Sequence, residues 1–112
     1  MDEKRVIKTL TEMGGKLWEE GEYRRIYFDA GIVAKIGGLE TWRYGTGNIS
    51  SATLNGANIS NSEAKRILSD LYYAKFWYDL TTGEWFTKGF EGRGNSLEVK
   101  NSFFTTVKAA IA

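Results

Sequence analysis

Four turn signals built around glycine divide the middle of the chain into short runs rich in β-branched and aromatic residues. The strongest is Asn55-Gly56, because a tight type I′ turn needs a positive φ angle at both positions, which asparagine and glycine adopt most readily. The others are Glu20-Gly21, Gly45-Thr46-Gly47 and the segment between Asp79 and Gly83. Reversals this short join antiparallel strands. The sequence therefore predicts a fold rich in β-hairpins.

Helical periodicity alternates with these hairpins. Apolar residues recur three or four positions apart in residues 2–13, in residues 61–72 and from Asn95 to the C-terminus, and a shorter helix is predicted for residues 30–36. Helices and hairpins in this order predict a single α+β domain covering residues 1–112. We expect antiparallel hairpins and a meander to form one sheet, with two or three helices packed on it.

Capping residues mark the start of the two longest helices. Ser60 and Glu63 form an S-x-x-E capping box, in which hydroxyl and carboxylate each accept a backbone N–H of the other residue. Asn95 and Glu98 repeat this spacing before the last helix. We therefore expect both helices to begin directly after the capping residue.

The chain contains no histidine and no cysteine. Serine–histidine triads, cysteine nucleophiles, histidine bases, disulfides and the usual zinc sites therefore cannot be built from it. Fifteen lysines and arginines nearly balance fourteen aspartates and glutamates, and the two signs are mixed along the chain. This charge argues against a protein that binds nucleic acid duplexes through many phosphates.

No targeting or membrane segment is visible in the sequence. The N-terminus MDEKRVIKTL begins with charges and lacks the apolar core of a secretion signal. No run approaches the ~18 apolar residues that a membrane span requires. We therefore expect a soluble, cytoplasmic protein without a membrane partner.

The acidic residues that remain have structural explanations. Glu19, Glu20 and Glu22 could hold a divalent cation or act as a glycosidase pair, but a solvated hairpin tip explains them without further assumption. Glu63-Ala64-Lys65 and Glu98-Val99-Lys100 match the E-x-K half of a metal nuclease pattern, yet both fall in predicted helices, where the glutamates have a capping role. We expect no metal, no cofactor and no enzymatic activity.

The stretch GEYRRIYFD places Arg24 and Arg25 side by side in an aromatic strand. Successive side chains of a strand point to opposite faces, so the two arginines belong to different faces. A turn at Glu20-Gly21 would set Trp18 opposite Tyr23 and Lys16 opposite Arg25. One face then carries the five residues that we expect to bind a partner, namely Lys16, Trp18, Tyr23, Arg25 and Tyr27.

This face combines aromatic rings that carry polar groups with cations that can lie over them. Such a composition is typical of protein-binding surfaces and of platforms for single-stranded nucleic acid. The alternative is that Trp18 and Tyr27 complete the core while Lys16 and Arg25 extend their charged ends to water.

A later hairpin offers a competing surface. Alternation places Lys75 and Trp77 on one face and Phe76 and Tyr78 on the other, and the following strand contains Trp85. Six phenylalanines, six tyrosines and four tryptophans exceed what a two-layer core easily hides. We expect exposed aromatic surface, which favours a protein partner or a homodimer.

Several short runs between residues 16 and 84 form a recognisable pattern, namely Trp18, Arg24 to Phe28, Tyr44 to Ser50, Asn55-Gly56, Ile59 to Asn61 and Asp79 to Gly83. With this pattern, that part of the chain loosely resembles small proteins of bacterial phages and mobile elements. The resemblance implies a setting in which small single-domain proteins bind and block host defence machinery, as anti-CRISPR proteins do. It carries over no functional residue.

Two functional hypotheses follow from the sequence. The first is a non-enzymatic inhibitor that occupies a surface of a larger protein, such as a host defence complex, through the face of Trp18 and Tyr27. The second is a single-strand nucleic-acid module that stacks bases on the same rings and contacts phosphates through Lys16, Arg25 and Arg43. Binding that weakens steeply as salt rises would favour the second.

Overall fold

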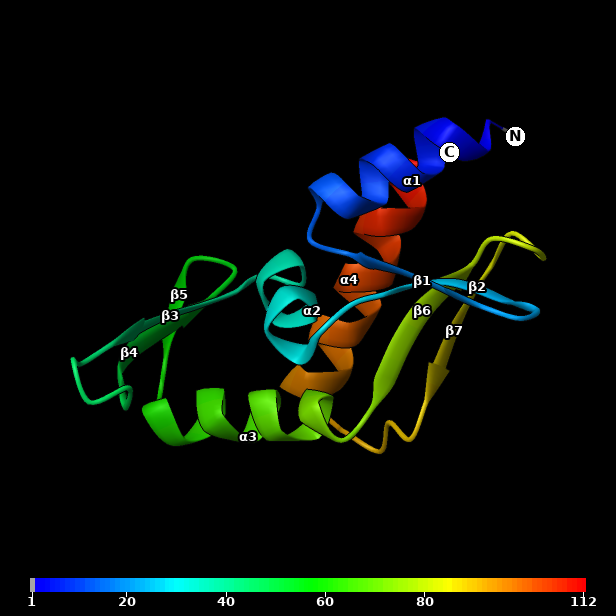
Figure 1. Cartoon of the computed structure of the whole chain (residues 1–112). Helices are drawn as coiled ribbons and strands as arrows, with labels where there is room; N and C mark the ends of the chain where they lie inside the picture. Colours follow the sequence, from blue (N-terminus) through cyan, green and yellow to red (C-terminus); the bar gives the residue numbers. More distant parts are fainter. Residues whose placement is uncertain (1) are drawn as a thin grey trace.

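The computed structural model describes residues 2–112, which form four helices and seven strands (Figure 1). None of these helices is long and apolar enough to cross a membrane. The elements follow in the order α1 (Glu3–Glu12), β1 (Lys16–Glu20), β2 (Tyr23–Tyr27), α2 (Ala30–Ile36), β3 (Leu39–Arg43), β4 (Ile49–Leu54), β5 (Ala57–Ile59), α3 (Asn61–Tyr72), β6 (Lys75–Asp79), β7 (Glu84–Lys88) and α4 (Asn95–Ala110).

The α+β class is confirmed, but the strands form two antiparallel sheets instead of one. Sheet A has the order β1-β2-β6-β7, and sheet B has the order β3-β4-β5. The edge of β2 that is not paired with β1 pairs with β6, so it is not available to β3. Helix α2 leads the chain away from sheet A, and the meander packs against α3 at the far end of the molecule (Figure 1).

One face of sheet A, the inner face, packs against helices α1 and α4. Ile26, Phe76 and Tyr78 are buried there, and Phe76 meets the ring of Phe103 from α4 with centroids 6.0 Å apart. Burial of such rings and aliphatic chains is the main favourable term in folding. The buried apolar residues of the four helices and both sheets, apart from Trp77, form one cluster.

The turn between α2 and β3 fixes α2 tightly against α4. A Cβ atom on Gly37 would collide with the carbonyl oxygen of Val99, so only glycine allows this approach of the two backbones. The predicted Asn55-Gly56 turn is confirmed, with φ angles of 50° and 84°. The predicted loop before β7 is also confirmed, because the N–H of Gly83 donates to the carbonyl of Asp79 at 2.8 Å.

The start of α3 agrees with the predicted capping box only in part. The hydroxyl of Ser60 accepts the N–H of Glu63 at 3.1 Å, as predicted. The carboxylate of Glu63 does not return to Ser60; it accepts from both Arg66 and Asn95. The guanidinium is a charged, two-pronged donor and outcompetes a single backbone N–H. Hydrogen bonds from Arg66 and then Asn95 lower the pKa of Glu63 to about 2.

The expected cap at the start of α4 is wrong. Gly94, with a φ of 57°, occupies the capping position, and Asn95 is the first residue of the helix. The Asn95 side chain instead donates to Glu63 at 3.0 Å, and buried Ser96 donates to Asp70 at 2.6 Å. The polar residues at the start of α4 therefore join this helix to α3.

Candidate protein-binding face

The first hairpin brings together the five residues that the sequence predicts as a site. Its turn lies at Gly21-Glu22, one residue later than predicted, and Trp18 therefore pairs with Arg25 rather than with Tyr23. An even shift in register keeps every side chain on its predicted face. Lys16, Trp18, Tyr23, Arg25 and Tyr27 accordingly share the face of sheet A opposite the inner face.

Strand order adds residues from the competing hairpin to the same face. Tyr27 pairs with Trp77 of β6, which pairs with Phe86 of β7. We call this surface the outer face. It consists of Lys16, Trp18, Glu20, Tyr23, Arg25, Tyr27, Lys75, Trp77, Asp79, Glu84, Phe86 and Lys88.

Four rings form a continuous row across the outer face. The centroid distances are 6.2 Å from Trp18 to Tyr27, 5.7 Å from Tyr27 to Trp77 and 5.5 Å from Trp77 to Phe86. Trp77 and Phe86 are stacked, and Trp18 also stacks on Tyr23 with ring centroids 6.0 Å apart. These distances are typical of favourable aromatic pairs, so the row is preorganised.

Arg25 is fixed within this row. Its guanidinium carbon lies 4.5 Å from the ring centroid of Tyr23 and 4.7 Å from that of Trp77. Its Nη1 donates to the Tyr27 hydroxyl at 2.7 Å. Cation–π contacts on two sides and a hydrogen bond hold the side chain in one position, so little rotamer entropy remains to be lost on binding.

The outer face is open to solvent. Helices α1 and α4 lie on the inner side of sheet A, and no helix of residues 2–112 lies against the other side (Figure 1). Tyr23 is 54% exposed, Trp18 40% and Phe86 36%. Trp77, which contacts Arg25, Tyr27 and Phe86, is buried. Tyr23 and Tyr27 therefore do not lie under a helix, and the predicted assignment of the two faces is confirmed.

Two buried donors on the outer face have no acceptor among the described residues. They are Nε of Arg25 and Nε1 of Trp77. A buried donor without a partner costs free energy and is uncommon in folded proteins. An acceptor from a partner would reach these atoms only after a neighbouring side chain moves.

An open hollow lies beside the row of rings. It has a volume of about 560 Å³, and its lining includes Lys16, Trp18, Tyr27 and Lys75. The hollow offers apolar surface between two lysines, which suits a protruding side chain of another protein.

The remaining charged candidates lie elsewhere. Arg24, on the inner side, binds Glu19 at 3.1 Å and Glu3 of α1 at 2.8 Å, and these hydrogen bonds raise the pKa of its guanidinium. Glu22, the neighbouring acidic residue at the hairpin tip, lies in the turn between β1 and β2. Arg43 belongs to sheet B, where it donates to the carbonyl of Gly47. It therefore does not extend the cationic surface around Lys16 and Arg25.

No family model, no curated protein and no solved structure matches the chain. The outer face is therefore interpreted from its own chemistry alone.

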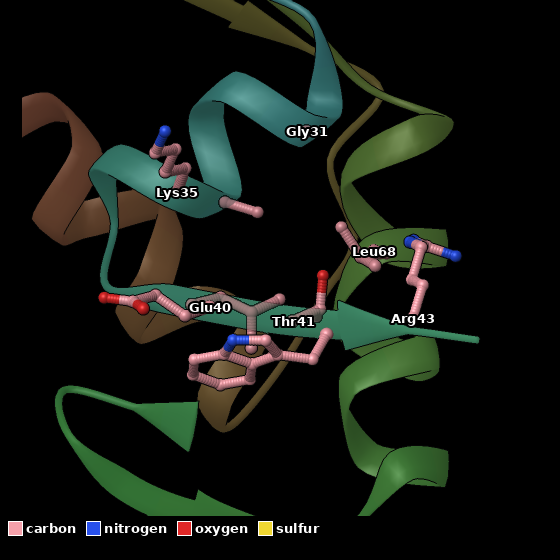
Figure 2. Close-up of a pocket in the computed structure, with 9 residues that line it drawn as sticks. Gly31, Lys35, Glu40, Thr41, Arg43 and Leu68 are labelled. Atoms are coloured by element: carbon pink, nitrogen blue, oxygen red, sulfur yellow. The ribbon is translucent and has the colours of Figure 1, made fainter. Parts of the chain in front are cut away.

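A second concavity lies between α2, β3 and α3 and has a volume of about 450 Å³ (Figure 2). Its charged side chains are Lys35, Glu40 and Arg43, whose ends do not converge on one point (Figure 2). Within residues 2–112, no group of three or more acidic residues could hold a metal ion. This second concavity therefore lacks the converging set of acids, bases or ligands that catalysis or metal binding requires.

The sequence predicts a competing surface on the hairpin of Trp77 and Trp85, and the structure corrects this. Trp85 pairs with Tyr78 on the inner face, whereas Trp77 pairs with Phe86 and belongs to the outer face. Alternation placed Trp77 correctly opposite Phe76, but only the pairing of β2 with β6 brings Trp77 next to Tyr27. That pairing joins residues about 50 positions apart and leaves no local pattern in either strand.

Proposed function

We propose that the chain is a non-enzymatic interaction protein of the cytoplasm that covers a surface of another protein with its outer face. One observation carries this proposal, namely the row of Trp18, Tyr27, Trp77 and Phe86, exposed at Trp18 and Phe86, with Arg25 held among the rings. Tryptophan, tyrosine and arginine dominate binding energy at protein interfaces, and preorganised side chains reduce the entropic cost of association.

The charges of the outer face favour a protein over nucleic acid. The outer face carries four cations and three acids. The cations are Lys16, Arg25, Lys75 and Lys88, and the acids are Glu20, Asp79 and Glu84. A surface that follows a phosphate backbone would be mostly basic. The resemblance to phage and mobile-element proteins makes a host defence complex the first larger partner to test.

Site-specific photo-crosslinking tests this proposal. A benzophenone amino acid replaces Phe86 on the outer face in one variant and Tyr72 of α3 in the control, and both chains are expressed with the candidate defence complex. Both native residues are exposed aromatics, so the substitution is conservative in each case. We expect a covalent protein adduct at position 86 and none at position 72.

Adducts at position 72 alone would contradict the proposal. An adduct at position 86 that disappears after nuclease treatment would support the single-strand nucleic-acid hypothesis instead.

A further inference from the structure

The outer face of β6 and β7 has a regular charge pattern along its strands. Lys75 is paired with Lys88 at one end, and Asp79 is paired with Glu84 at the other. Trp77 lies midway between the base and the acid of β6, two residues from each. Because alternate residues of a strand are evenly spaced, the basic pair and the acidic pair lie about 7 Å to either side of the aromatic row.

This pattern is complementary to itself under one two-fold rotation. An axis that runs across the strands, along the aromatic row, reverses strand direction in a second copy. Lys75 then faces Asp79 of the second copy, Lys88 faces Glu84, and the rings meet at the centre. An axis parallel to the strands would instead place base on base and acid on acid. Charge therefore selects the first arrangement.

Among the described residues, none of these four charged side chains forms an ion pair, and Lys75, Lys88 and Glu84 are exposed. Asp79 accepts two backbone N–H groups of the following loop, which holds its carboxylate at the end of β6. Opposed charges of a second copy would therefore meet groups that have no internal ion pair to give up.

We propose that a second copy of this chain occupies the outer face, with its strands antiparallel to those of the first across the two-fold axis. The inference rests on the proposed function, because it takes the outer face to be a protein contact and names the occupant.

Four strands of five residues make a face of about 19 by 17 Å. Two such faces cover about 650 Å² of flat area in total, which belongs to the small, weak end of protein interfaces, so we expect a dimer that forms only at micromolar or higher concentration.

Charge-reversal variants, measured singly and as a mixture, test this arrangement. Sedimentation equilibrium measures how strongly each sample self-associates. The variants are Lys88→Glu and Glu84→Lys, with Lys65→Glu on the exposed side of α3 as the control. Each of the first two places like charges at both symmetric contacts of its own homodimer and should weaken self-association by about tenfold or more. The control should dimerise as the native chain does.

The mixture of Lys88→Glu with Glu84→Lys gives the decisive result. In the mixed dimer both contacts again join opposite charges, so we expect association close to that of the native chain. Circular dichroism and thermal unfolding verify that each variant is folded. A mixture that stays monomeric, or single reversals that dimerise normally, overturns the arrangement.

The two proposals can fail separately. A native chain that is monomeric well above micromolar concentration overturns self-association, whereas a crosslink at position 86 to another protein still supports the proposed function. If neither contact forms, both proposals fail.

Discussion

At the scale of single residues, Arg24 and Arg25 show how one step along a strand changes the role of a side chain. Arg24 joins β2 to Glu19 and to Glu3 of α1, and it lies on the inner side. Arg25 lies among the rings of Tyr23 and Trp77 on the outer face. Alternation alone was sufficient to separate the two arginines from the sequence. It could not predict the contact with Trp77, which depends on strand order.

This difference predicts unequal effects of alanine substitution. Arg25→Ala removes a rigid, partly desolvated cation from the proposed contact and should weaken partner binding by about 1–2 kcal/mol. Arg24→Ala removes two solvent-screened ion pairs and should cost little folding stability, with affinity unchanged. Calorimetric titration with the partner measures the affinity of both variants. Urea unfolding measures their folding stability. A loss of affinity in Arg24→Ala alone would place the contact elsewhere.

At the scale of elements, local capping and turn signals predict well where their partners are local. The Ser60 cap of α3 and the Asn55-Gly56 turn involve neighbours in the sequence, and both are confirmed. The first turn of α4 was mispredicted because Gly94 occupies the capping position, and the Asn95 amide donates to Glu63 as an acceptor on α3. That acceptor belongs to another helix, and no pattern within α4 reveals it.

The bridge between α3 and α4 predicts a dependence of stability on acid. Hydrogen bonds lower the folded-state pKa of Glu63 from the ordinary value of 4.5 to about 2. Its contribution to stability is therefore fully present above about pH 4.5 and is lost as pH falls towards about 2, because the unfolded chain binds the proton first.

Urea unfolding between about pH 5 and pH 2 measures this dependence. Glu63→Gln should lose less stability than the native chain over that range, although it should be less stable near neutral pH. Glu12→Gln, which also removes one negative charge, should follow the native curve. Parallel curves for Glu63→Gln and the native chain would show that the bridge does not couple folding to acid.

Two glycines of the α2 region should respond oppositely to alanine. Gly31 lies in α2 with open space around its Cα, so Gly31→Ala should stabilise the protein by up to about 1 kcal/mol through helix propensity. Gly37→Ala forces a methyl group against Val99 of α4 and should destabilise by about 1–3 kcal/mol. Thermal unfolding compares the two. Equal effects would contradict the close approach of α2 to α4.

At the scale of the whole molecule, the sequence predicts the fold class but not the arrangement of the sheets. Each hairpin follows from its own turn, whereas the pairing of β2 with β6 depends on which open strand edge is covered in the folded chain. This long-range choice both separates the meander into sheet B and joins the two aromatic hairpins into one surface. The candidate site is therefore a consequence of topology as much as of residue type.

The central claim is that another protein chain covers the outer face. Hydroxyl-radical footprinting, read residue by residue by mass spectrometry, measures this most directly by comparing the associated state with the diluted, dissociated state. We predict that association protects Trp18, Tyr23 and Phe86 from oxidation. Tyr72 and Tyr73, which are more than 70% exposed at the end of α3, should react equally in both states. Protection of these two tyrosines without protection of the outer-face rings would contradict the claim.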